Sequence, residues 1–486
     1  MASSVSGTGT ISSAGLGSSL DVSSIISALM AVERKPLEQL QSQAETMQTK
    51  LSSVGKVKSY FSELQTKANA LTSTTLWTGT TATASDSAVK VATSTGAVAG
   101  SYAVQVNRLA VGQTVTGSAL ASASDTLGEG SLTIELGSYG AGDPAADFTP
   151  KAGSSAVTID IGPGETSLSA IRDKINAAGA GVTATLVTDA SGTRLSLRSR
   201  ETGAENAFRI SASETSDDGN AATGLSSLGY DATAASSAMS RTTTAANADL
   251  TINGIAVASA SNTLNNVVDG LTLTLTKTTT SAVDVTVAED STAIKTAITD
   301  FVSAFNTLAS YIKTQTAYNA DSKTAGALQG DQSTLALQSQ LRNIINQGSS
   351  AASAWSRLSE IGITMKSDGT LETSSTKLDN ALGNLGELRK LLATDGSGAA
   401  DSGFIRRFKR LADSALASDG VFATRTSGLQ SSIDRNGKSQ DAMELRLEKT
   451  QARLQAQYSS LDTTMSKLNN LSSYLTQQIS ALNTSA

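Results

Sequence analysis

The sequence of 486 residues contains no cysteine and no histidine. Without thiols it can form no disulfide and no thiolate metal site, and without imidazoles it can form no histidine metal site and no Cys-His or Ser-His catalytic pair. Aromatic residues make up 4% of the chain and charged residues 16%, while alanine, serine, threonine and glycine fill much of the rest. These absences exclude most hydrolase chemistries, and the composition is typical of extracellular assembly proteins.

No apolar run approaches the roughly 18 residues of a membrane-spanning helix, so we expect no membrane insertion. Residues 1–19 lack the basic segment and the apolar segment of a secretory signal, and by their composition we expect them to be disordered. The net charge of -6 and the pI near 5.0 argue against a nucleic-acid partner. The length predicts about three domains.

Leucine recurs at every seventh position near the C-terminus. These leucines are Leu447, Leu454, Leu461, Leu468, Leu475 and Leu482. Tyr458, Met465 and Ile479 each follow a leucine by four residues, which gives a heptad pattern with leucine at d. A helix over residues 440–482 would be about 65 Å long and would need a partner to cover its stripe. The polar a positions, Gln451 and Ser472, weaken this seam and favour contacts that form outside the folded monomer; the alternative is an ordinary long core helix.

A second apolar stripe lies near the N-terminus. Asp21 predicts the start of a helix. Pro36 then either ends that helix or opens the next one. One face of this first helix is predicted to carry Val22, Ile25, Ile26, Leu29 and Val32. From Leu37 to Leu71 the apolar residues then alternate in steps of three and four. Because the two stripes match, we predict that they pack together, antiparallel.

The predicted terminal-helix interface draws on both stripes. It comprises Leu40, Met47, Leu51, Val54, Phe61, Leu64, Leu447, Leu454, Tyr458, Leu461, Met465, Leu468, Leu475, Ile479 and Leu482.

Between Trp77 and Glu289 short alternating runs are separated by clusters of Gly, Asp, Asn and Ser, which predicts strands. The predicted strands are residues 88–93, 101–109, 131–136, 156–161, 182–188, 193–199, 250–257, 271–277 and 282–288, with one helix at 167–178. Residues 201–247 have weak strand signals. This texture predicts two β-rich domains, the inner one inserted into the outer one.

The helical period returns at Asp290 and continues to the C-terminus. A loop ending at Asp331 leads into one of these helices, the Asp368-Gly369 pair predicts the turn of a small hairpin, and the last helix is expected to start near Thr426. Four basic residues, Arg406, Arg407, Lys409 and Arg410, form a cluster. Such a cluster is usually a solvated face; the alternative is a site for an acidic partner.

No motif for catalysis or cofactor binding stands out. Gly162-Pro163-Gly164 lacks the rest of a dinucleotide fingerprint, and Asn319 to Gly326 lacks the spacing of an EF-hand loop. The many carboxylates include no pair that the sequence marks as acid and base. We therefore expect no enzyme, no cofactor and no metal site.

The chain resembles the flagellar filament cap protein family, also called hook-associated protein 2, over nearly its whole length. The resemblance rests on Gly15 to Asp21, Glu33 to Leu37, Gly100 to Ala110, Ser167 to Ala184, Gly326 to Asp331, Leu358 to Leu371, Tyr458 to Leu461 and Ser473 to Leu475. Each stretch alone is a weak signal, but their order and separation together are specific.

The resemblance implies an assembly factor without catalytic chemistry. Cap proteins of this kind are secreted unfolded by the flagellar type III apparatus, and the resemblance implies an export chaperone for them. Outside the cell they form a homo-oligomeric ring at the distal filament tip, where they retain exported flagellin and promote its insertion. Their terminal helices act as legs that reach into the filament end, and their β domains can also touch host surface glycans.

We therefore predict an α+β multidomain protein with terminal coiled-coil and helical-bundle domains and an inserted pair of β-rich domains. The predicted domains are the legs at 1–42 and 440–486, the bundle at 43–77 and 290–439, the outer β-rich domain at 78–114 and 246–289 and the inner one at 115–245. The alternatives are another flagellar axial subunit, such as a junction protein or flagellin, and a surface adhesin.

Overall fold

The computed structural model describes residues 21–484, so the predicted disorder of residues 1–19 lies outside the described part. The chain divides into two compact units, Met1–Leu76 with Ser291–Ala486, and Trp77–Asp290. The first is helical and the second is built of sheets, which confirms the predicted α+β multidomain class. The bounds proposed for the smaller domains stay predictions.

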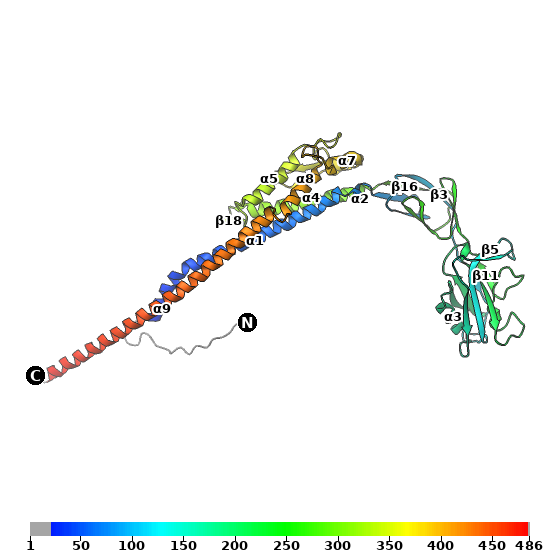
Figure 1. Cartoon of the computed structure of the whole chain (residues 1–486), viewed down its shortest axis with the longest axis horizontal. Helices are drawn as coiled ribbons and strands as arrows, with labels where there is room; N and C mark the ends of the chain where they lie inside the picture. Colours follow the sequence, from blue (N-terminus) through cyan, green and yellow to red (C-terminus); the bar gives the residue numbers. More distant parts are fainter. Residues whose placement is uncertain (1–20, 485–486) are drawn as a thin grey trace. The chain divides into compact units, whose positions relative to one another are not determined.

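Two long helices dominate the first unit, and Figure 1 shows them side by side. These are α1 (Val22–Thr72) and α9 (Val421–Thr484). The other elements of this unit are α2 (Thr74–Trp77), which ends at the first residue of the second unit, α4 (Ser291–Thr316), β17 (Tyr318–Asn319), β18 (Thr324–Ala325), α5 (Gln332–Asn346), β19 (Ile363–Met365), β20 (Leu371–Thr373), α6 (Ser375–Leu382), α7 (Leu385–Ala393) and α8 (Phe404–Leu416).

The core of the bundle is aromatic and aliphatic. Phe408 of α8 packs edge-on against Phe301 and Phe305 of α4, with ring centroids 5.2 and 5.9 Å apart. The hairpin of β19 and β20 turns through Gly369, whose φ is +87°, as the Asp-Gly pair predicts. Asn306 of α4 holds this hairpin, because its side-chain amide donates to the Leu371 carbonyl at 2.8 Å and accepts from the Leu371 N–H at 2.6 Å.

Pro36 does not end the first helix: α1 continues through it. A proline inside a helix removes one backbone hydrogen bond and costs about 3 kcal/mol. Val22, Ile26 and Met30 precede the proline and Leu37 follows it, and all four pack with residues of α9, so this packing supports the helix on both sides of the proline. The predicted apolar face was partly wrong, since Leu29 is 41% exposed and Val32 is 62% exposed.

The second unit contains two hydrophobic cores, one for each pair of sheets. The residues of the first core come from two sheets. One is five-stranded, with the order β1-β16-β3-β12-β13, and the other is three-stranded, with the order β14-β15-β2. These strands are β1 (Thr80–Ala84), β2 (Val89–Thr93), β3 (Gly100–Arg108), β12 (Ala248–Ile252), β13 (Ile255–Ser259), β14 (Thr263–Val268), β15 (Leu271–Leu275) and β16 (Val283–Glu289). The predicted strand at residues 250–257 is a hairpin instead, because Asn253 and Gly254, with φ of 51° and 82°, form a tight turn between β12 and β13.

The second core lies between residues of β4, β5, β7, β8, β9 and β10, with α3 packed against it. Its elements are β4 (Thr114–Thr116), β5 (Gly130–Tyr139), β6 (Phe148–Pro150), β7 (Val157–Ile161), α3 (Leu168–Ala177), β8 (Val182–Asp189), β9 (Gly192–Ser199), η1 (Ala204–Asn206), β10 (Ala207–Glu214), η2 (Leu225–Leu228) and β11 (Ser240–Thr243). The weak signals in residues 201–247 concealed β10, which pairs with β5 over eight residues.

Candidate functional site

The candidate site is the pair of terminal helices, which lie antiparallel in the first unit (Figure 1). Where the pair joins the bundle, Phe61 of α1 and Phe422 of α9 meet edge to face, with ring centroids 5.6 Å apart. Val54, Leu64 and Leu429 are buried in the same region. This part of the pair is a continuous apolar seam.

Farther along the pair, burial decreases. Leu40, Met47 and Leu51 are half-buried, which fits a seam with only two helices in it. Asn436 of α9 is buried as well, and its side-chain oxygen accepts a hydrogen bond of 2.6 Å from Gln440. A buried amide in a two-helix seam fixes its register but lowers its stability.

The start of α1 packs on the middle of α9. Leu447 is buried with Val22, Ile26 and Met30, and Leu37, Met443, Leu454 and Tyr458 pack against this cluster. Asp21 caps α1, since its carboxylate accepts from the hydroxyl of Ser23 at 2.7 Å and from the hydroxyl and N–H of Ser24 at 2.5 and 3.0 Å. These hydrogen bonds, with that from Ser23 the strongest influence, lower the pKa of Asp21 to about 2.

Beyond Tyr458 the leucine stripe is exposed. Leu461 is 45% exposed, Leu468 54%, Leu475 52% and Ile479 59%, while Met465 is half-buried and the side chain of Leu482 lies outside the described part. These residues are placed in the predicted terminal-helix interface, but the described part of α1 does not reach them. It begins at Val22, and residues 22–37 pack beside residues 443–458.

The exposed stripe is wider than the heptads predict. Leu471 and Tyr474 are 55% and 57% exposed and were not among the predicted residues. The available signal was helical spacing, since Leu471 lies three residues after Leu468 and Tyr474 lies three residues after Leu471. Between Ser459 and Thr484 the sequence has two charged residues, Asp462 and Lys467. The end of α9 therefore presents an amphipathic, nearly uncharged face.

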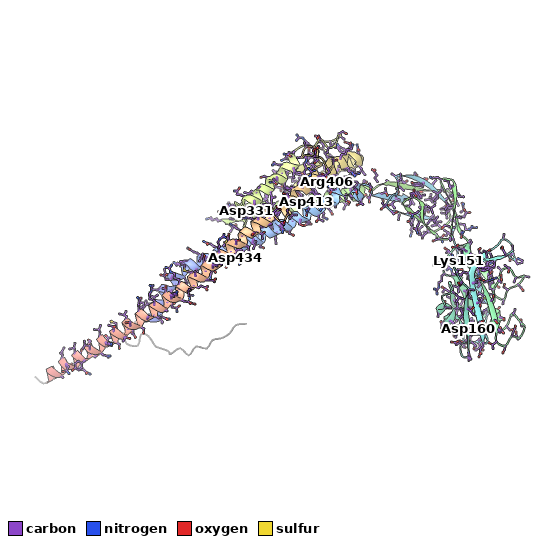
Figure 2. The ribbon with its side chains drawn as sticks, in the orientation of Figure 1. Lys151, Asp160, Asp331, Arg406, Asp413 and Asp434 are labelled. Carbon is purple, nitrogen blue, oxygen red and sulfur yellow. The ribbon has the colours of Figure 1, made fainter. Side chains whose placement is uncertain are left out.

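The basic cluster on α8 is occupied by contacts within the bundle. Arg406 and Arg410 both pair with Asp395, and Lys409 lies 2.9 Å from Asp413. Figure 2 labels Arg406 and Asp413, which both lie in the helical unit. Arg407 is buried and donates to the carbonyl groups of Ser402 and Gly348, at 3.1 and 3.0 Å. Burial lowers the pKa of its guanidinium group. The prediction of a solvated face is wrong for Arg407, and its charge is not free to bind an acidic partner.

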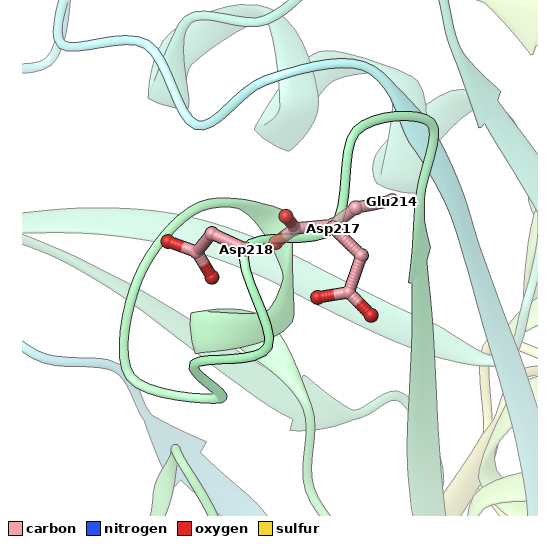
Figure 3. A group of neighbouring side chains, drawn as sticks. All are labelled: Glu214, Asp217 and Asp218. Atoms are coloured by element: carbon pink, nitrogen blue, oxygen red, sulfur yellow. The ribbon is translucent and has the colours of Figure 1, made fainter.

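An acidic cluster, Glu214, Asp217 and Asp218, lies at the end of β10 (Figure 3). Its carboxylates hold the following loop: Glu214 accepts from the Ser226 N–H at 2.5 Å, Asp217 from the Gly219 N–H at 2.8 Å, and Asp218 from the Thr223 hydroxyl at 2.7 Å. The Thr223 hydroxyl also lowers the pKa of Asp218. These contacts give the cluster a structural role.

Within residues 21–484 no helix combines the length and the hydropathy needed to cross a bilayer.

Comparison with known proteins gives one consistent result. The model of the flagellar hook-associated protein 2 N-terminus matches residues 18–113, that of the C-terminus matches residues 245–470, and a flagellin hook IN motif matches residues 147–201. The chain is similar to flagellar hook-associated protein 2 of Escherichia coli strain K12, with 35% identity over 96% of this chain and 98% of the relative. Its similarity to the protein of that name from Salmonella typhimurium is 33% over 98% and 99%.

A solved structure agrees. The D1-D2-D3 domains of the flagellar cap protein FliD from Escherichia coli match with a TM-score of 0.57 and 33% identity, over 78% of this chain and 99% of that one.

Proposed function

The chain belongs to the flagellar hook-associated protein 2 family and is a flagellar filament cap protein, and from this premise we propose how its terminal helices act. The protein acts at the distal tip of the filament. We propose that several copies form a ring there, retain newly exported flagellin and promote its insertion. The exposed stripe at the end of α9 carries this proposal, because an uncovered apolar face on a single chain is suited to contacts with other subunits.

The physical basis of the proposed contact with other subunits is the apolar surface of α9 that α1 does not cover. Four large apolar side chains, Leu461, Leu468, Leu475 and Ile479, are each about half exposed on one helix. Burying each of them would contribute about 1 kcal/mol. The scarcity of charge makes the contact a packing interaction, which lets the same stripe engage successive subunits of similar shape.

The proposal also covers how the protein leaves the cell and which other molecules it binds. We propose secretion by the flagellar export apparatus and an export chaperone inside the cell; the absence of cysteine suits a chain that is threaded unfolded. Host surface glycans are a further proposed partner of the β-rich unit. Binding of the purified full-length protein to a glycan array, lost when its β-rich unit is deleted, tests that contact.

The main experiment is gene deletion followed by electron microscopy of cells and medium. We expect short or absent filaments and unpolymerised flagellin in the medium, both restored by the wild-type gene. Normal filaments in the deletion strain would contradict the capping role.

A stripe variant makes this test specific to the legs. Replacing Leu461, Leu468 and Leu475 with glutamine keeps a helix former at each position and removes the apolar face. We expect this variant to be secreted but not to restore elongation. The matched control replaces the exposed polar residues Thr463, Asn470 and Gln477 with alanine, at the same spacing on another face, and should restore it.

A further inference from the structure

The two long helices contain three internal glycines that packing does not require. These are Gly55 in α1 and Gly428 and Gly437 in α9. A Cβ built at any of the three meets no atom within 4 Å. Glycine weakens a helix interior relative to alanine, since it has more backbone freedom to lose. Lack of room for a larger side chain therefore does not explain why these positions are glycine.

Gly55 and Gly428 lie at the same level of the antiparallel pair. The stacked rings of Phe61 and Phe422 set the register, and Gly55 comes six residues before Phe61 as Gly428 comes six residues after Phe422. Both helices therefore have a glycine at one height, whereas Gly437, nine residues farther along α9, has no glycine beside it on α1. Over residues 22–54 of α1 and 438–484 of α9 the sequence has no glycine at all.

That height lies near the end of α4, and the loop at residues 325–329 continues beside residues 42–50 of α1. Ser53 donates to Gln315, near the end of α4, across 3.4 Å, and Arg425 pairs with Asp331, which caps α5. Ser53 is a buried polar residue at this height, next to the buried Val54 and Leu429. The weak backbone of both helices therefore lies where the helix pair extends past α4.

We propose that Gly55 and Gly428 form a flexible joint. At this joint residues 22–54 of α1 and 429–484 of α9 bend together relative to the bundle. Hinges are a few residues that absorb a change in φ and ψ, and glycine does so with the least steric resistance. Paired glycines let both helices bend at one height without parting. That the joint lets the legs follow a growing filament end rests on the proposed function. That the joint exists does not rest on it.

Pulsed electron–electron double resonance tests the joint on the purified full-length protein. The chain has no cysteine, so spin labels go only to introduced sites. Suitable sites are Ser310→Cys on α4 and Glu448→Cys on α9, both exposed. The test variant adds Gly55→Ala and Gly428→Ala, which fit without contact; the control adds Ser52→Ala and Ser431→Ala, exposed residues three positions away.

We expect a broad distance distribution for the wild type and for the serine control. The alanine substitutions at the glycines should remove the outlying distances that bent helices produce and leave one narrower peak. Equal widths for all three proteins would overturn the joint. Since the measurement is made on the isolated protein, a failure of the capping proposal would leave this result unaffected.

Discussion

Arg425 at the start of α9 pairs with Asp331, with its Nε and Nη2 atoms 2.8 and 2.6 Å from the same carboxylate oxygen. The other oxygen of Asp331 accepts from the N–H and hydroxyl of Thr334, at 3.0 and 3.1 Å, and so caps α5. One buried carboxylate thus joins the loop before α5 to the helix that continues into the leg.

Replacing Asp331 with alanine should destabilise the helical unit by about 2–3 kcal/mol, because it removes a helix cap and leaves Arg425 without its partner. Urea unfolding followed by circular dichroism measures this loss. The control is Asp300→Ala, which breaks the exposed pair with Lys67 and should cost less than about 1 kcal/mol. Equal losses would show that the Asp331 contacts do not stabilise the unit.

Arg407→Met should also be destabilising, by about 2–3 kcal/mol. The substitution keeps apolar volume but removes the charged donor that Arg407 supplies to the carbonyl groups of Gly348 and Ser402, of which the Ser402 carbonyl keeps the hydroxyl of Ser349 at 2.9 Å. Lys409→Met, on the same helix but paired at the surface with Asp413, should change stability by less than about 1 kcal/mol. Thermal unfolding of the two variants makes the comparison, and a larger loss for Lys409→Met would contradict it.

The basic cluster shows where sequence reasoning stops. Periodicity identifies the helix that carries Arg407, yet it cannot show that loop carbonyls from residues 348 and 402 turn toward one guanidinium group, because this depends on the packing of distant segments. In contrast, the heptads over Leu37 to Leu71 depend only on local spacing and predict the continuous seam of α1. The same local pattern cannot show how far α1 covers α9. Leu461 and Leu475 are exposed among the described residues, and their place in the terminal-helix interface stays a prediction.

Turns divide in the same way. The Asp368-Gly369 pair was recognised, because alternating residues flank it closely, whereas Asn253-Gly254 was hidden inside an apolar run and the hairpin it makes was predicted as one strand. The error with Pro36 has the opposite cause: a strong local signal is overridden by the tertiary packing of Met30 and its neighbours on α9.

The contact between α7 and the loop at Ser353 should weaken in acid. Glu387 accepts from Lys390 and from the N–H groups of Ser353 and Ala354, and these bonds, that from Lys390 first, lower its pKa from 4.5 to about 2. A depressed carboxylate pKa stabilises the fold above pH 4.5, and this stabilisation is lost as the pH falls toward about 2. The difference in unfolding midpoint between wild type and Glu387→Gln should therefore shrink over that range. A difference that does not vary with pH would contradict the assignment.

The last prediction concerns the polar a positions of the leg. Gln451 and Ser472 are both exposed on α9, so leucine can enter at either position without displacing a packed side chain. Replacing both with leucine extends the apolar stripe and should tighten contacts between the legs and the filament end, since each buried leucine contributes about 1.5–3 kcal/mol. A cap that must release its contacts as each subunit inserts should then move more slowly. We expect filaments to elongate more slowly in cells carrying this variant, measured by fluorescent labelling of growing filaments. The control replaces exposed Gln455 and Thr476 with alanine and should leave the rate unchanged. If leg packing is demonstrably tighter and growth is normal, release of the leg contacts does not limit elongation.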